Sequence, residues 1–114
     1  MTAPKVTEMV ARYAQALEAR GYSPATVRSK LICLHKFERF LAGHEVGDLM
    51  KVTPAMLEDF RLEVMHTPTA KGLPPRAVTV NNALEAVRGL YRVLLDLELV
   101  PVDPARKLSL LKEP

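Results

Sequence analysis

Residues 23–43 read SPATVRSKLICLHKFERFLAG, and this stretch decides the fold class. Ser23 is a good helix cap, and Pro24 falls at the first helical position, where its missing N–H costs nothing. Apolar residues then recur three and four positions apart on one face, namely Val27, Leu31, Leu34, Phe37 and Leu41. Gly43 is a stop signal, so the stretch predicts an amphipathic helix over about 24–42.

The same signals predict three more helices. The first runs from about Pro4 to Arg20 and ends at Gly21, and Thr53-Pro54 starts another that continues to about His66. Pro and Gly make residues 67–75 a loop, and a fourth helix follows over about 76–97. Residues 104–111, after Pro101, have room for one short turn or helix. The buried stripes expected on these helices are Met9, Tyr13, Ala16 and Leu17; Leu57, Phe60 and Val64; and Val80, Leu84, Val87, Tyr91 and Leu94.

Length and composition favour a single helical domain. The chain has 114 residues, of which 48% are apolar and 25% charged, while aromatics make up only 5% and Trp is absent. A core built from Leu, Val, Ala and Met suits helices better than a sheet, and no strand pattern competes. We therefore predict an all-α, compact four-helix orthogonal bundle, with room for a short fifth helix. The expected domain covers residues 1–111, and residues 112–114 begin a linker.

The residues that several classes of function require are missing from the sequence. The single cysteine, Cys33, cannot form an internal disulfide and is expected to pack. No signal peptide and no run of roughly 20 apolar residues occurs, so cytoplasmic location is expected, without a membrane partner. His35, His44 and His66 lie far apart in sequence, and the glycines are scattered singly. Glu58, Asp59 and Glu63 read as a solvated face. We expect no metal, no cofactor and no enzyme active site.

Charge is distributed unevenly along the chain. Residues 23–43 sum to +3 and residues 71–95 to +3, whereas residues 44–70 between them sum to −3. Two basic segments around an acidic one indicate a basic face, which suits a polyanionic partner. The simpler alternative is that Lys and Arg occupy solvated outer faces, as they do on most helices.

The outer faces of the second and fourth helices carry the candidate binding residues. Helical spacing puts Arg28, Ser29, His35, Lys36 and Arg39 on one, and Asn81, Asn82, Glu85, Arg88, Gly89 and Arg92 on the other. Asn and Arg side chains can bond adenine and guanine edges in a major groove. Glu85 would repel phosphate unless it pairs with Arg88 or accepts from a cytosine amino group. Gly89 implies close approach of another backbone, from a helix or from nucleic acid.

The loop before the fourth helix adds positive charge. Lys71 and Arg76 precede the helix start, and Thr79 offers a hydroxyl nearby. Free N–H groups at a helix start bind phosphate oxygens. We therefore expect this end of the helix to contact a phosphate.

The order of these signals resembles the N-terminal core-binding, SAM-like domain of phage integrases and Xer-type tyrosine recombinases. The resemblance covers about residues 5–112. It rests on Ser23-Pro-Ala-Thr26 followed by Leu34, Phe37, Phe40 and Leu41; on Thr53-Pro54; on Thr79-Val-Asn81 with Leu84, Val87-Arg88 and Tyr91; and on Leu99-Val100 before Asp103-Pro104-Ala105.

The resemblance implies a domain that forms one arm of a clamp on double-stranded DNA, with its second and fourth helices across the major groove. The matching positions for DNA contact are Thr26, Arg28, Ser29, Thr79, Asn81, Asn82 and Arg88. Charge alone adds Lys36, Arg39, Lys71, Arg76 and Arg92. Lys30 stands where the family often has an aromatic residue, so it must extend outward or contact phosphate.

The resemblance also implies partners: a catalytic domain of the same polypeptide, and other recombinase protomers. None of the tyrosines matches the family's nucleophile and no His-x-x-Arg occurs, so the chain alone should not cut DNA. A Gly common near Leu97 or Glu98 is missing. The alternative function is a helical protein-interaction module without DNA binding, using Leu49, Met50 and Val52 or Leu108, Leu110 and Leu111 as anchors. A helix-turn-helix repressor is less favoured, because no short turn joins two short helices.

Overall fold

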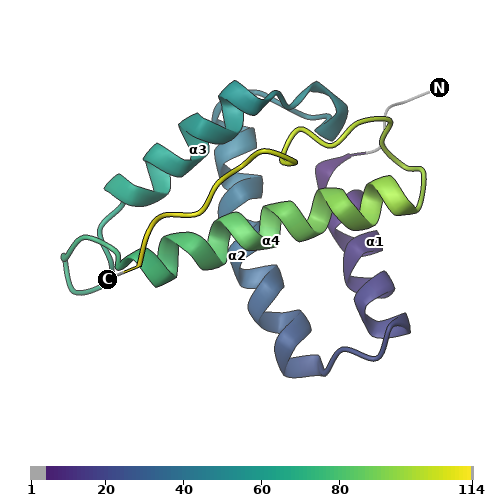
Figure 1. The fold of residues 1–114 in the computed structure, drawn as a ribbon, viewed down its shortest axis with the longest axis horizontal. Coiled ribbons are helices and arrows are strands. Elements are labelled where there is room, and N and C mark those ends of the chain that lie inside the picture. The colour runs from purple at the N-terminus through teal and green to yellow at the C-terminus, as the bar shows by residue number, and fades with distance from the viewer. Residues whose placement is uncertain (1–4, 114) are drawn as a thin grey trace.

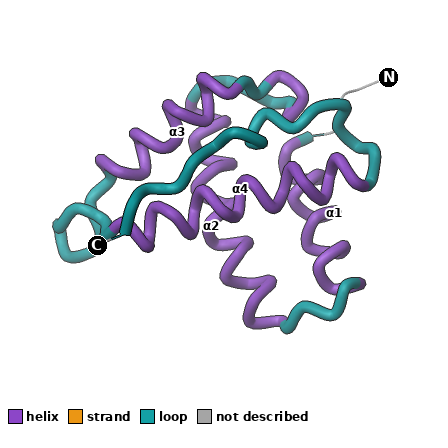
Figure 2. The backbone as a smooth tube through the Cα atoms, in the orientation of Figure 1, coloured by secondary structure: helices purple, strands orange, loops and turns teal. Residues whose placement is uncertain are grey.

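The computed structural model describes residues 5–113, so Pro4, where the first helix was expected to begin, lies outside the described residues. Its helices are α1 (Val6–Ala19), α2 (Pro24–Gly43), the 3₁₀ helix η1 (Leu49–Lys51), α3 (Pro54–His66) and α4 (Ala77–Asp96). Figure 1 shows α1 and α2 side by side in opposite directions, with α4 crossing over them and α3 above α4. No strand occurs between residues 5 and 113 (Figure 2), and the predicted all-α four-helix fold is confirmed.

Two of the helices begin as their sequences predict. The Ser23 hydroxyl accepts from the Thr26 N–H at 3.2 Å, and Pro24 starts α2. The Thr53 hydroxyl accepts from the Met56 N–H at 3.2 Å, and Pro54 starts α3. Each cap satisfies an N–H that has no partner inside the helix, which is typically worth about 1 kcal/mol.

The ends of α1, α2 and α4 depend on left-handed residues. Gly21 (φ +85°) ends α1 as predicted, and the Tyr22 N–H returns to the Leu17 carbonyl. The predicted stop at Gly43 is wrong, because Gly43 is helical and Glu45 (φ 58°) takes the left-handed conformation. Glu98 (φ 59°) does the same after α4, near the position where the resemblance leads us to expect a glycine. This conformation destabilises a non-glycine residue by roughly 1–2 kcal/mol.

The core lies between the crossing helices and is centred on α4. Every residue of its predicted stripe is buried, and Phe37 of α2 meets Phe60 of α3 with ring centroids 5.1 Å apart. The Tyr91 hydroxyl donates to the Leu49 carbonyl at 2.9 Å, which ties η1 to α4. Among residues 5–113, no helix has the length and apolarity needed to cross a membrane.

Most of the anchors expected for a protein-interaction module belong to this core. Leu49, Val52 and Leu108 are buried, and Leu110 and Leu111 are half-buried against the core. Met50 remains exposed. These side chains complete the domain's own packing, so that expectation for them is wrong.

The C-terminal segment, residues 104–113, folds back over the molecule. Residues 104–107 form a turn, and the rest runs extended in the space between α3 and α4 (Figure 1). The guanidinium of Arg61 on α3 donates to the Ser109 carbonyl, and Asn81 on α4 exchanges two hydrogen bonds with the main chain of Leu111. The segment is therefore fastened to both helices.

Candidate nucleic-acid interface

Two cavities line up between α2 and α4, and together they form what we call the α2–α4 groove. The first, about 260 Å³, is lined by Thr26, Ser29, Lys30, Cys33, Asn82, Glu85 and Ala86. The second, about 340 Å³, is lined by Tyr13, Leu17, Arg20, Tyr22, Lys30, Glu85, Arg88, Gly89, Arg92 and Val93. Lys30 and Glu85 line both cavities, so the two adjoin. The groove joins side chains from both helices that the sequence singled out.

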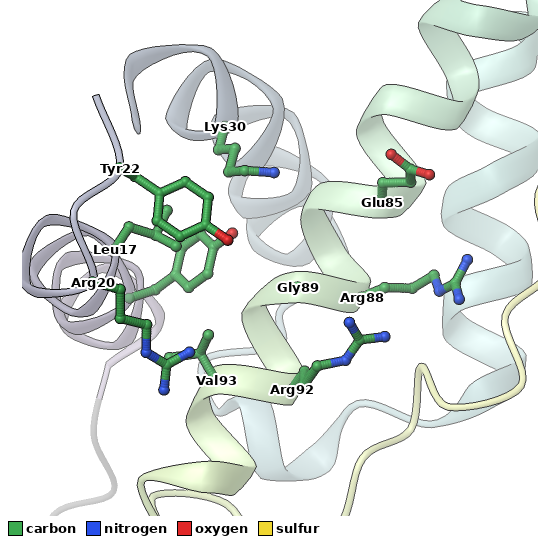
Figure 3. A pocket seen from close by; sticks show the side chains of 10 residues that line it. Leu17, Arg20, Tyr22, Lys30, Glu85, Arg88, Gly89, Arg92 and Val93 are labelled. Carbon is green, nitrogen blue, oxygen red and sulfur yellow. The ribbon is translucent and has the colours of Figure 1, made fainter. Parts of the chain in front are cut away.

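The second cavity is strongly positive. Arg20, Lys30, Arg88 and Arg92 line it against a single carboxylate, Glu85. Figure 3 shows Lys30 pointing from α2 towards α4, and Arg88 extending from α4 to the side away from α2, with Arg92 beside it. Arg20 also lies 3.9 Å from Asp96, but both side chains are about half exposed, so this pair contributes little. Anions are therefore attracted to this end of the groove.

Lys30 lies on the same face of α2 as the buried Leu34, Phe37 and Leu41, yet its side chain is half-buried rather than enclosed. The amino-terminal half of α2 extends past α4, as Figure 1 shows, so the inner face of α2 opens into the groove there. Lys30 can thus bury its methylenes while its ammonium reaches the cavity. This explains how a lysine occupies a position where the resemblance leads us to expect an aromatic residue.

Gly89 has a packing role. A Cβ at this position would lie 3.1 Å from the hydroxyl oxygen of Tyr13, which is buried in α1. The close neighbour of Gly89 is therefore α1, and this contact explains a glycine that weakens the middle of α4. The expected close approach of another backbone is not seen, because the nearest atoms belong to the Tyr13 side chain.

The expectation that Asn81 contacts DNA is wrong. Asn81 falls on the outer face of α4 by helical spacing, but it is only 5% exposed because the C-terminal segment covers it. Its Nδ2 donates to the Leu111 carbonyl at 2.9 Å and to a Glu113 carboxylate oxygen at 3.3 Å, and its Oδ1 accepts from the Leu111 N–H at 2.7 Å. Its hydrogen-bonding groups are occupied within the domain.

The remaining expected residues lie in three places. Thr26, Ser29, Lys30, Asn82, Arg88 and Arg92 line the α2–α4 groove. Lys36, Arg39 and Thr79 line a different cavity of about 360 Å³, bounded by α3 and the 67–75 loop and floored by Phe40, Phe60 and Val64. Arg28, Lys71 and Arg76 are exposed and line none of these cavities.

Two lining residues, Arg20 and Tyr22, were missed in the sequence. They flank Gly21 between α1 and α2, and attention to α2 and α4 alone passed over them. The available signal was Gly21 itself, because a tight turn places its neighbours beside the first turns of the next helix.

Two buried tyrosines are held neutral. Burial, and secondarily the nearby Tyr22, raises the pKa of Tyr13 to about 12. Burial, and then the carboxylates of Asp103 and Asp48, raises the pKa of Tyr91 still further. Both hydroxyls stay protonated at neutral pH, so Tyr13 adds no negative charge to the groove that it lines.

Comparison with known proteins agrees with the fold. A family model described as the phage integrase N-terminal SAM-like domain matches residues 10–97. A crystal structure of the N-terminal domain of a phage integrase/site-specific recombinase from Haloarcula marismortui superposes with a TM-score of 0.82. The superposition covers 97% of this chain and 100% of that chain, at 14% sequence identity. Among curated proteins, none matches this chain significantly.

Proposed function

The chain belongs to the phage integrase N-terminal SAM-like domain family, and from this premise we propose that it binds duplex DNA through the α2–α4 groove. It acts as one arm of the DNA clamp of a site-specific tyrosine recombinase. The observation that carries the proposal is the convergence of Lys30, Arg88 and Arg92 with Thr26 and Asn82 along one groove.

This arrangement supports two kinds of contact with DNA. The cations at the α1 end can neutralise phosphates, which supplies most of the affinity of such proteins and makes it sensitive to salt. Thr26, Ser29 and Asn82 at the other end carry hydroxyl and amide groups of the kind that bond base edges in a major groove. One end of the groove therefore suits the DNA backbone and the other suits the bases.

We propose further that the DNA-cutting residues lie on a catalytic domain outside these 114 residues. In this proposal residues 1–111 are the DNA-binding domain and residues 112–114 begin the connection to the catalytic domain. The other partners are further recombinase protomers on the same DNA, in the cytoplasm of the producing cell. Arg28, Lys36, Arg39, Lys71, Arg76 and Thr79 are proposed as contacts with flanking phosphates, because they lie outside the groove.

A direct binding titration tests the proposal. Fluorescence anisotropy with a labelled random-sequence duplex at physiological salt should give a dissociation constant in the range of about 10⁻⁴ to 10⁻⁶ M, and binding should tighten steeply as salt is lowered. Lys30→Glu and Arg88→Glu should each weaken binding at least tenfold, because each reverses a charge in the groove. Arg12→Glu is the matched control, since Arg12 is exposed on α1 and lines neither groove cavity.

Absence of binding to any duplex would refute the proposal. Equal losses for Arg12→Glu and Arg88→Glu would place the binding site elsewhere. A stable oligomer in sedimentation, indifferent to added DNA, would favour the protein-interaction alternative.

A further inference from the structure

Glu85 is the one carboxylate among the side chains that line the α2–α4 groove, and it lines both cavities. It stands on α4 between Asn82 and Arg88, one helical turn from each, and Lys30 faces it from α2. With a neutral residue at this position, Arg88 and Arg92 would bind phosphate more strongly. A carboxylate in the middle of a phosphate-binding groove therefore needs a reason.

Pairing with the neighbouring cations does not supply that reason. The ion pairs between residues 5 and 113 join Arg20 to Asp96, His35 to Glu38 and Arg61 to Glu58, and none includes Glu85. Glu85 is exposed, so its oxygens are open to a ligand in the groove. A group that binds there against Glu85 must be a hydrogen-bond donor, because the ionised carboxylate only accepts.

We propose that Glu85 is a specificity-determining residue that accepts a hydrogen bond from the exocyclic amino group of a cytosine in the major groove. Glu and Asp pair with this amino group because it is the donor that cytosine presents there. The carboxylate also repels phosphate, so it keeps the DNA backbone away from the centre of the groove. Lys30, Arg88 and Arg92 then hold the backbone at the α1 end of the groove, and the base edges face Glu85.

The inference rests on the proposed DNA binding, and one set of measurements separates the two. Selection from a randomised duplex pool with the wild-type chain gives its preferred sequence, which should contain a cytosine at one discriminated position. Affinities are then measured for this duplex, for the same duplex with that cytosine pair replaced, and for random duplex. The variants are Glu85→Gln and Glu85→Ala, and Glu8→Gln is the control for net charge, because Glu8 is exposed on α1 and lines neither groove cavity.

Removing the carboxylate should change affinity and selectivity in opposite directions. Glu85→Gln and Glu85→Ala should bind random duplex about two- to threefold more tightly at low salt, because a charge that repels phosphate is gone. The preference for the cytosine duplex, which in the wild type should be about tenfold or more, should be lost in Glu85→Ala and reduced in Glu85→Gln, whose amide oxygen is an uncharged acceptor. Glu8→Gln should keep that preference, and circular dichroism should show the helicity of all variants unchanged.

Three outcomes would overturn the inference. Wild-type protein that binds random duplex without any base preference would leave the proposed function standing and remove the role of Glu85. A preference that survives in both Glu85 variants would do the same. Wild-type protein that binds no duplex at all would overturn the proposed function and the inference together.

Discussion

Replacing Asn81 with alanine should destabilise the domain and leave its affinity for DNA unchanged. The side chain makes two hydrogen bonds with the main chain of Leu111 and is 5% exposed, so both are shielded from water. At about 1 kcal/mol each, the two hydrogen bonds stabilise the folded state by about 2 kcal/mol. The better helix propensity of alanine offsets about 0.5 kcal/mol of their loss. The free energy of unfolding should therefore fall by about 1–2 kcal/mol, which lowers Tm by about 3–10 °C.

The matched control is Asn82→Ala, one position along the same helix. Asn82 is exposed and lines the groove, so its loss should weaken DNA binding and leave stability unchanged or slightly raised. Urea denaturation and anisotropy on both variants measure the two quantities, and amide exchange at Leu111 should quicken only in Asn81→Ala. Asn81→Ala with wild-type stability and weakened DNA binding would refute the reasoning, because Asn81 would then be a DNA contact.

Four further expectations concern the groove and its supports. Gly89→Ala should be about 1 kcal/mol more favourable in a Tyr13→Phe background than in the wild type, because the nearest atom then becomes the ring carbon 3.9 Å away; a double-mutant cycle with no coupling would contradict this. The pKa of Tyr13 is raised to about 12, so the folded state holds its proton longer than the unfolded chain and stability should fall as pH rises from about 10 to 12. That decline should be shallower in Tyr13→Phe, and equal slopes in chemical denaturation would count against the assignment. Glu98→Gly should raise Tm by relieving about 1 kcal/mol of left-handed strain, and an unchanged or lower Tm in thermal unfolding would contradict this. Cys33, the single cysteine, lines the groove, so saturating duplex DNA should slow its alkylation; an unchanged rate would place the DNA elsewhere.

The order and extent of the helices could be predicted because their signals are local. Ser23 and Thr53 bond amides three residues away, and the stripe on α4 needs only helical spacing. The end of α2 could not be predicted this way. Glu45 turns left-handed so that the Val46 N–H reaches the Leu41 carbonyl and Val46 packs against the core, and this gain outweighs the stop signal of Gly43.

The candidate site could be predicted less completely, because helical spacing describes one helix at a time. It placed Arg88, Arg92 and Asn82 correctly on the open side of α4. It placed Asn81 there as well, since nothing within α4 shows that a segment 30 residues later covers its first turns. The opposite case is Lys30. Helical spacing places it on the buried face of α2, but α4 does not cover that part of α2, so Lys30 opens into the groove.

The fold-back of the C-terminal segment affects the order in which the domain matures during synthesis. Its bonds join residues 48 apart for Arg61 and Ser109 and 30 apart for Asn81 and Leu111, so they form only after nearly the whole chain has emerged. Until then Asn81 and the apolar seam, that is, the core side chains that pack around Leu108, face water. A nascent chain cut after residue 97, where the family match stops, would keep all its helices and still expose that seam, as aggregation-prone intermediates do. The short segment after the last helix thus completes the cover of the core, and a chain that lacks it is prone to aggregate.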